Sequence, residues 1–232
     1  AALREKNDPS PHILVMTATP IPRTLAMSLY GDLDLSIIDE LPPGRKPIET
    51  LRRTDSGRLK VWGFLKKAIA QGRQAYIVYP LIEESDSMDY KDLMDGYDSI
   101  CRDFPRPDYQ ISIVHGRMKS ADKILEMERF AKGETHIMVA TTVIEVGVDV
   151  PNASVMVIEH AERFGLAQLH QLRGRIGRGK HESYCYLISQ RTTLESESRL
   201  NAILKTNNGF EIAQADLEIR GPGRYFGRHQ HG

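Results

Sequence analysis

Short apolar segments alternate with amphipathic segments along most of the chain. The apolar segments predict strands at 12–16, 34–38, 48–53, 75–79, 111–114, 136–140, 154–158 and 184–189. Helices are predicted between them at 23–30, 55–71, 93–104 and 120–132. Strands that are apolar throughout and separated by amphipathic helices are typical of a parallel sheet covered on both faces. We therefore expect an α/β fold with a doubly wound parallel sheet.

Two of the predicted helices have a clear apolar side. The first should begin at Asp55 or Ser56 and end at Gly72, and the second should be capped by Ser120 and end at Gly133. Their inward residues are expected to be Leu59, Trp62, Leu65 and Ile69 in the first, and Ile124, Met127 and Ala131 in the second. The acidic segment 83–98 has little pattern, and we interpret it as a loop that leads into the helix at 93–104.

Changes in composition divide the chain into three parts. The segment 41–47 contains three prolines and a glycine, which is typical of an extended linker, so we place a boundary at residue 47. Beyond residue 190 the pattern becomes helical, with a capping box at 192–195 and a stop at Asn208 and Gly209. We expect residues 1–47 to end one domain, residues 48–190 to form the sheet domain, and residues 191–232 to form a helical hairpin and a loop. The hairpin should bury Leu200, Ile203 and Leu204 from one helix, and Phe210, Ala213 and Leu217 from the other.

The composition is that of an ordinary globular protein, with 41% hydrophobic and 27% charged residues. The formal net charge is zero, so nucleic-acid binding would have to come from local basic patches. The chain has no apolar run long enough to cross a membrane. Its two cysteines show no ligand spacing, and the histidines do not either, so we predict no metal site and a reducing cytosol.

Polar residues directly follow three predicted strands. They are Thr17 and Thr19, His115 and Arg117, and Thr141 and Thr142. Ligands of a doubly wound sheet bind beyond the carboxyl ends of its strands, so we expect these residues to converge on one edge. At a helix start, Thr141 and Thr142 could bind a phosphate, and a plain helix cap is an equally good interpretation. Gly147 and Asp149 suit close approach to a sugar, or alternatively a helix end and a turn before Pro151.

A cluster of arginines and glycines at 171–179 is the strongest chemical signal in the chain. Guanidinium groups bind phosphate oxygens in a bidentate manner, and this cluster contains no acid. Arg175 and Arg178 are three residues apart, so on a helix they would project from one face. The glycines at 174, 177 and 179 weaken a helix, which is reasonable where a backbone or a ligand approaches closely. We therefore predict that the cluster binds a nucleotide, with a solvated basic surface as the alternative.

Several segments resemble the signature motifs of superfamily 2 helicases. They are TATPIPR at 17–23, HGRM at 115–118, ATTVIEVGVD at 140–149 and QLRGRIGR at 171–178. More narrowly, YGDLDLSIIDELPPGR at 30–45 and the segment 208–223 resemble the RecG family of ATP-dependent DNA helicases. The resemblance extends over essentially the whole chain. It implies two RecA-like domains that bind ATP and Mg²⁺ between them, of which this chain holds the end of the first and all of the second.

The resemblance also implies roles for individual residues. Arg175 and Arg178 match the catalytic arginines that contact the nucleotide phosphates from the second domain. The remaining matches are Gly147, Asp149 and Gln171 for nucleotide binding, Thr141, Thr142, His115 and Arg117 for DNA binding, Thr17 and Thr19 for coupling, and Arg220 and Gln230 for translocation. The tail departs from the family, which usually has an acid where Arg224 stands and Thr-Arg where this chain has Arg228 and His229.

A phosphate-binding G-x-x-x-x-G-K-[ST] loop and a DExH box do not occur in the 232 residues. We therefore interpret the chain as an excised part of a longer protein and expect it to be inactive alone, because the Walker lysine and the Mg²⁺ carboxylates are missing. The expected whole is a bacterial cytoplasmic, nucleoid-associated enzyme that remodels forks and Holliday junctions in repair and recombination. Its expected partners are branched double-stranded DNA, the missing amino-terminal portion and a single-stranded DNA-binding protein, but no membrane.

Two other hypotheses remain at this point. One is the translocase of a transcription-repair coupling factor, which shares the helical hairpin but usually lacks the pattern DELPPGR found at 39–45. The other is a non-catalytic module that binds nucleic acid or protein and keeps a helicase-like fold. A Walker motif and a DExH box upstream of this chain would favour a motor protein over the non-catalytic module.

Overall fold

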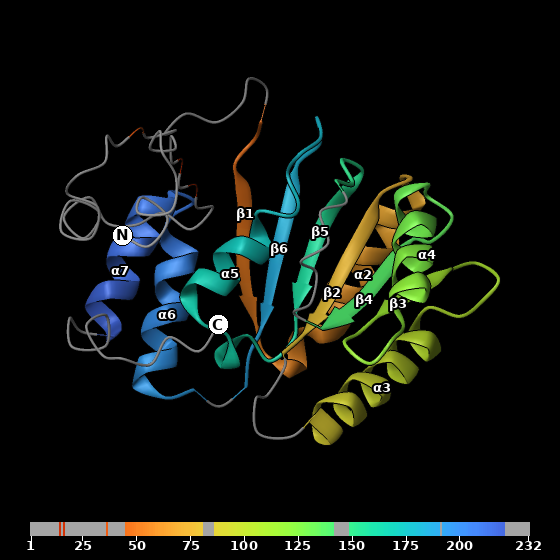
Figure 1. Ribbon diagram of the computed structural model, residues 1–232, viewed down its shortest axis with the longest axis horizontal. Coiled ribbons are helices and arrows are strands. Elements are labelled where there is room, and N and C mark those ends of the chain that lie inside the picture. The colour runs from red at the N-terminus through yellow and green to blue at the C-terminus, as the bar shows by residue number, and fades with distance from the viewer. Residues whose placement is uncertain are drawn as a thin grey trace, which may run out of the picture.

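The computed structural model describes residues 45–80, 86–141, 149–190 and 192–220, together with Leu14, Met16 and Ser36. Within this part, six parallel strands form one sheet in the order β1-β6-β5-β2-β4-β3. The strands are β1 (Ile48–Arg53), β2 (Gln74–Tyr79), β3 (Ile111–Val114), β4 (Ile137–Thr141), β5 (Ala153–Ile158) and β6 (Ser183–Ile188). Figure 1 shows them side by side with helices on both faces. The predicted doubly wound parallel sheet is confirmed.

Helices cover the two faces of the sheet and enclose two apolar cores. The helices are α2 (Arg58–Ala70), α3 (Asp86–Asp103), α4 (Ser120–Ala131), α5 (Leu166–Arg173), α6 (Leu194–Lys205) and α7 (Gly209–Arg220). Side chains from α2 and α3 pack into one core, and side chains from α4, α5, α6 and α7 pack into the other. Every residue of β2, β4 and β5 is buried, because each of these strands has strand neighbours on both edges and helices over both faces.

Two predicted helix faces are confirmed only in part. A short 3-10 turn precedes α2, in which Trp62, Leu65 and Ile69 are buried as predicted, whereas Leu59 is 77% exposed. The buried side of α2 consists of Val61, Trp62, Leu65, Ala68 and Ile69. Helix α4 buries only Met127 and Phe130, whereas Ile124 is 53% exposed and Ala131 is also exposed. Helix α4 therefore has a narrower apolar side than the sequence pattern predicted.

The helix boundaries also differ from those predicted. Helix α3 begins at Asp86 rather than near residue 93, and Ser120 begins α4 without capping it through its side chain. Helix α6 is capped by Thr193, whose hydroxyl accepts a hydrogen bond from the Ser196 amide, one residue later than expected. The helix ends predicted at Gly72 and Gly133 are confirmed, and both glycines are left-handed, with φ of 80° and 76°.

The predicted helical hairpin is present as α6 and α7, which pack against each other and against α5. Leu200 and Ile203 are buried as predicted, and Leu204 is partly buried. In α7 the buried residues are Ile212 and Asp216, whereas Phe210, Ala213 and Leu217 are only partly buried. The predicted strands at 12–16 and 34–38 and the helix at 23–30 lie outside the described residues, so the division into three parts remains a prediction.

Gln74 joins three segments through its buried side chain. Its Nε2 atom donates to the carbonyl oxygens of Phe130 and Thr135 at 2.6 and 2.8 Å, and its Oε1 atom accepts from Asn152 at 3.1 Å. We expect Gln74→Leu to lower the free energy of unfolding by about 1–3 kcal/mol, because two buried carbonyl groups lose their donors. Urea unfolding followed by circular dichroism measures this change.

The exposed Gln71 at the end of α2 provides the control. Gln71→Leu should stay within about 0.5 kcal/mol of the wild type. Equal stabilities of the two variants would contradict the role assigned to the Gln74 hydrogen bonds.

Candidate functional site

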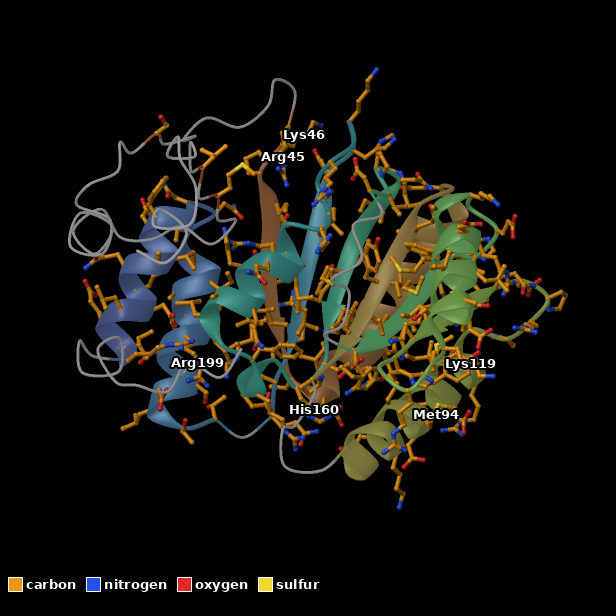
Figure 2. All side chains as sticks on the ribbon, viewed as in Figure 1. Arg45, Lys46, Met94, Lys119, His160 and Arg199 are labelled. Carbon is orange, nitrogen blue, oxygen red and sulfur yellow. The ribbon has the colours of Figure 1, made fainter. Side chains whose placement is uncertain are left out.

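The predicted site residues lie on two opposite edges of the sheet. The strand register pairs Val114 with Ala140, so His115 and Thr141 follow as neighbours at the carboxyl edge. Figure 2 labels His160 at this same edge, just after β5, whereas Arg45 and Lys46 lie at the opposite, amino edge before β1. Asp149 precedes β5 and Arg178 precedes β6, so both lie at the amino edge. The groups assigned to DNA and those assigned to nucleotide are therefore separated by the length of the strands.

The carboxyl edge contains three of the predicted DNA-binding residues. Arg117 is exposed in the turn between β3 and α4, which the Met118 amide closes by donating to the His115 carbonyl oxygen at 3.2 Å. Burial lowers the pKa of His115, and the nearby charges of Lys123 and Arg117 lower it further. Both effects favour the neutral imidazole, which has one hydrogen-bond donor and one acceptor. Thr141 is buried, and its hydroxyl has no hydrogen-bond partner among the described residues.

Two glycines determine the path of the chain after α5. At Gly177 the backbone has a φ of 74°, and an added Cβ atom would come within 2.9 Å of the Ile48 side chain. At Gly179 an added Cβ atom would overlap the carbonyl oxygen of Pro151. The chain thus passes closely over the beginnings of β1 and β5, which only glycine allows. This path brings Arg178 alongside the residues that precede β5.

Arg178 forms an ion pair with Asp149 at the amino edge. Its Nη1 atom lies 3.1 Å from Asp149 Oδ1, and its Nε atom donates to the Gly174 carbonyl oxygen at 3.2 Å. The side chains are 35% and 57% exposed, so the pair is open to solvent on one side. Arg175 makes no side-chain hydrogen bond or ion pair with another described residue. Burial raises the pKa of the nearby Tyr76 to about 12, against the opposing positive charges of Arg175 and Arg178.

Two sequence-based expectations about the arginines are wrong. Helix α5 ends at Arg173, so Arg175 and Arg178 lie in turns beyond the helix and not on one helical face. An acid does reach the cluster, because folding brings Asp149, which precedes β5, to Arg178, which precedes β6. The cluster as a whole therefore does not require an external anion to balance every arginine.

Arg173 does not belong to the nucleotide-facing group. It is 2% exposed and donates to the Ile203 carbonyl oxygen at 2.8 Å and to Thr50 Oγ1 at 3.2 Å. Burial lowers its pKa. Arg173 thus joins α5 to α6 and β1 and cannot reach a ligand at the surface.

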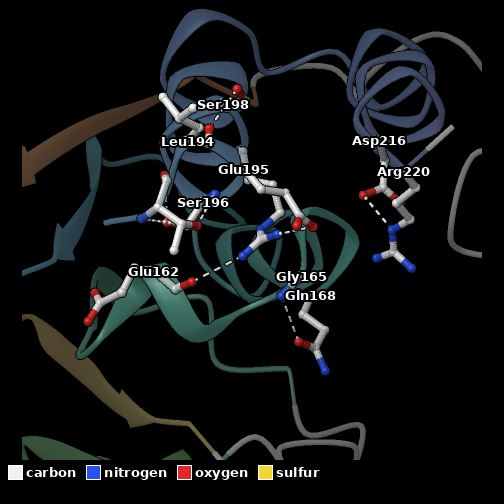
Figure 3. A network of polar contacts seen from close by, with 11 residues as sticks. Glu162, Gly165, Gln168, Leu194, Glu195, Ser196, Ser198, Asp216 and Arg220 are labelled. Atoms are coloured by element: carbon white, nitrogen blue, oxygen red, sulfur yellow. Dashed lines mark hydrogen bonds and ion pairs between the residues drawn. The ribbon is translucent and has the colours of Figure 1, made fainter. Parts of the chain in front are cut away.

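Arg220 lies beside the beginning of α5. Figure 3 shows its Nε atom directed at Asp216, and the Nε–Oδ1 distance is 3.0 Å. Its Nη2 atom lies 3.3 Å from where a Cβ atom on Gly165 would stand, which is at the start of α5 on the carboxyl edge. Gln171 is exposed on α5. Thr17, Thr19, Thr142, Gly147 and Gln230 lie outside the described residues.

Two charged contacts at the carboxyl edge were not predicted from the sequence. Glu159 directly follows β5, is almost fully buried and bonds to Arg58, which also bonds to Asp55 at 2.6 Å. Burial raises the pKa of Glu159, and the charge of Arg58 opposes this shift. Arg199 bridges α6 to the turn after β5 by donating to the Glu162 carbonyl oxygen at 3.2 Å (Figure 3). In the sequence, the position of Glu159 directly after a predicted strand marks it as a candidate site residue. Nothing in the sequence indicates that Arg58 is its partner.

Among the described residues, no group of three or more histidine, cysteine, aspartate or glutamate side chains could hold a metal ion. In the same part of the chain, no helix is both long enough and apolar enough to cross a membrane.

The structural role of Arg173 leads to a stability prediction. We expect Arg173→Met to lower the free energy of unfolding by about 1–3 kcal/mol, because the buried Ile203 carbonyl group loses its donor. Urea unfolding measures this, and Arg163→Met provides an exposed arginine as the control. Unchanged stability of Arg173→Met, combined with weaker nucleotide binding, would show that Arg173 faces a ligand instead.

The chain is similar to known helicases over much of its length. The family of helicase conserved C-terminal domains matches residues 60–180, about half of the chain. An ATP-dependent DNA helicase RecG from Synechocystis sp. is 51% identical over 223 residues, which cover 96% of this chain and 27% of that protein. The chain spans about a quarter to a third of the length of the curated relatives that it matches.

Solved structures show the same fold. A structure of RecG bound to a three-way DNA junction matches with a TM-score of 0.75 and 45% identity, over 90% of this chain and 27% of that one. Domain 2 of the DEAD-box helicase Mss116p, bound to an RNA duplex, matches in fold alone, with a TM-score of 0.51 and 19% identity over 73% of this chain and 68% of that one. The predicted RecA-like fold is therefore confirmed. The chain belongs to the family of helicase conserved C-terminal domains, and over most of its length it is similar to the RecG DNA helicases.

Proposed function

We propose that this chain carries the second RecA-like motor domain of an ATP-dependent DNA helicase that remodels branched DNA in repair and recombination. The observation that supports this most directly is the solvent-open pair of Arg178 and Asp149, with Arg175 beside it, on one edge of a RecG-like domain. This pair offers a cation for phosphate and an acid for a sugar hydroxyl at the same place. The 51% identity to a RecG helicase favours this function over a coupling-factor translocase or a non-catalytic module.

The nucleotide would lie against the amino edge. Asp149 and the Gly174 carbonyl group hold Arg178 in place, while its Nη2 atom makes no hydrogen bond with a described residue. A guanidinium held in this way can contact a phosphate without losing much side-chain freedom. Arg175 would add a second cation, and Gln171 and Gly147 would complete this side of the site.

ATP, when bound, supplies the free energy of phosphoanhydride hydrolysis. In this proposal Arg175 and Arg178 stabilise the negative charge that develops on the phosphates. Mg²⁺ would be held by carboxylates outside the described residues, on the first RecA-like domain of the longer protein. Thr17 and Thr19 would couple that domain to DNA.

DNA would lie along the carboxyl edge. His115, Arg117, Thr141 and Thr142 would contact its backbone there, and Arg220 and Gln230 would act in translocation. Helix α5 begins near Arg220 on this edge and ends just before Arg175 on the other. We propose that α5 transmits movement between the two sites as a rigid element. The proposed location of the longer protein is the bacterial cytoplasm with the nucleoid, with single-stranded DNA-binding protein as a further partner.

Arg178→Ala tests the nucleotide role in the full-length protein that carries this chain. We expect ATP hydrolysis stimulated by forked DNA to fall by about 10³-fold or more, because a phosphate-contacting arginine contributes on this scale. Steady-state release of phosphate measures the rate. Arg129→Ala is the matched control, because Arg129 is 34% exposed and also forms ion pairs, with Glu126 at 2.8 Å and with Glu134 at 3.8 Å.

The control should retain wild-type turnover. Unchanged turnover of Arg178→Ala would remove Arg178 from the proposed role. A similar loss in both variants would instead indicate a general loss of folded protein, which circular dichroism detects.

The 232-residue chain by itself should not hydrolyse ATP, with or without forked DNA. The reason is that it contains neither a Walker lysine nor a DExH box. Phosphate release by the purified chain, compared with a buffer blank, measures this. If DNA stimulates phosphate release by this chain and Arg178→Ala abolishes that release, the proposal that the rest of the nucleotide site lies outside the chain is wrong.

A further inference from the structure

A basic groove lies on the α2 face of the sheet, opposite the face that α4 and α5 cover. It has a volume of about 390 Å³ and is bounded by α2 on one side and by β1 and β6 on the other. Its charged residues are Arg53, Lys60 and Lys67, and the acids Glu49 and Glu182 lie next to it, beside Tyr184. Tyr76 lies near Arg178 and Asp149 and belongs to the core on the α4 and α5 face, whereas the groove lies over the core on the α2 face. The groove is therefore separate from the pair of Arg178 and Asp149.

The floor of the groove is apolar between two lysines. Lys60 and Lys67 are two helical turns apart on α2, which places their Cα atoms about 10 Å from each other. Phe64 lies between them and packs edge-to-face on Tyr184 and Tyr186, with ring centroids 4.8 and 5.5 Å away. A Cβ atom on Gly63 would meet nothing within 4 Å, and Gly63 and Phe64 both line the groove. Neither lysine forms an ion pair with a described residue.

We infer that this groove binds an acidic peptide segment of a partner protein, with an apolar side chain over Gly63 and Phe64 and carboxylates at Lys60, Lys67 and Arg53. An extended peptide advances about 3.3 Å per residue, so acids three residues apart match the spacing of the two lysines. Charge complementarity selects an anionic partner, and the apolar floor selects one that also carries an aliphatic or aromatic residue.

The aromatic rings argue against single-stranded nucleic acid as the occupant. Binding of that kind uses exposed ring faces on which bases stack. Tyr186 is only 6% exposed, and Phe64 is partly buried against it. The rings therefore form a floor for a side chain and not a stacking platform.

Fluorescence anisotropy with a labelled peptide tests this inference on the full 232-residue chain. The probe is Gly-Asp-Asp-Phe-Ser-Asp-Asp-Gly, which places acids three residues apart on either side of the phenylalanine, and we expect saturable binding. Replacing its phenylalanine by serine should weaken binding about tenfold, because the apolar floor loses its occupant. Lys60→Glu combined with Lys67→Glu should weaken binding at least tenfold, whereas Lys91→Glu combined with Lys205→Glu should not change it.

Gly63→Leu separates a shaped groove from a merely charged surface. It keeps every charge and favours the helix, but it fills the open space at Gly63 in the groove. We expect at least a tenfold loss of peptide binding with an unchanged or higher melting temperature. Wild-type binding by Gly63→Leu would overturn the inference, as would the absence of saturable binding to the wild type.

A labelled twelve-residue oligothymidine is the competing probe. If it binds through Lys60 and Lys67 and displaces the peptide at lower concentration, the groove is a nucleic-acid site and the inference is wrong. Because the groove lies on the other face from Arg178, the groove variants should retain full ATP hydrolysis in the longer protein. If Arg178 proves to have no role in ATP hydrolysis, the result of the peptide-binding experiment would still stand.

Discussion

The close approach of the chain to itself at Gly177 and Gly179 determines the geometry of the candidate nucleotide site. At these positions the backbone lies against the Ile48 side chain and the Pro151 carbonyl group, where a larger residue would collide. The turn they form directs Arg178 toward Asp149, which comes from the preceding crossover. Without this contact between two backbone segments, neither arginine beyond α5 would have a defined position.

The parallel sheet separates the residues assigned to DNA from the residues assigned to the nucleotide. Each crossover returns the chain from the carboxyl edge to the amino edge, so residues just after a strand and residues just before one lie on opposite sides of the domain. His115 and Thr141 belong to the first group, and Asp149 and Arg178 belong to the second. Helix α5 lies between the segment that follows β5 and the turn that carries Arg175, and the buried Arg173 fastens its end to α6 and β1.

The helical hairpin stabilises this arrangement from one side only. Helices α6 and α7 pack on α5, and Arg199 and Arg220 contact the turn after β5 and the start of α5. On the other face, α2 leaves β1 and β6 partly uncovered, which creates the basic groove over Tyr186. The two faces of the sheet therefore differ: helices cover the face of α5, α6 and α7, whereas the α2 face has an open groove.

The sequence alone determined the strands, their parallel arrangement and the family resemblance, because these depend on local runs of apolar residues and on contiguous motifs. The family resemblance assigned Arg175 and Arg178, and not Arg173, to the nucleotide, but the local sequence offered no physical reason for the difference, since Arg173 and Arg178 both adjoin glycine in the same short segment. Their roles depend on partners far along the chain, namely the Ile203 carbonyl group for one and Asp149 for the other. It also did not reveal that α2 exposes Leu59, because the angle at which a helix meets a sheet depends on every element packed around it. Only the tertiary structure decided which charged groups are buried and which face solvent.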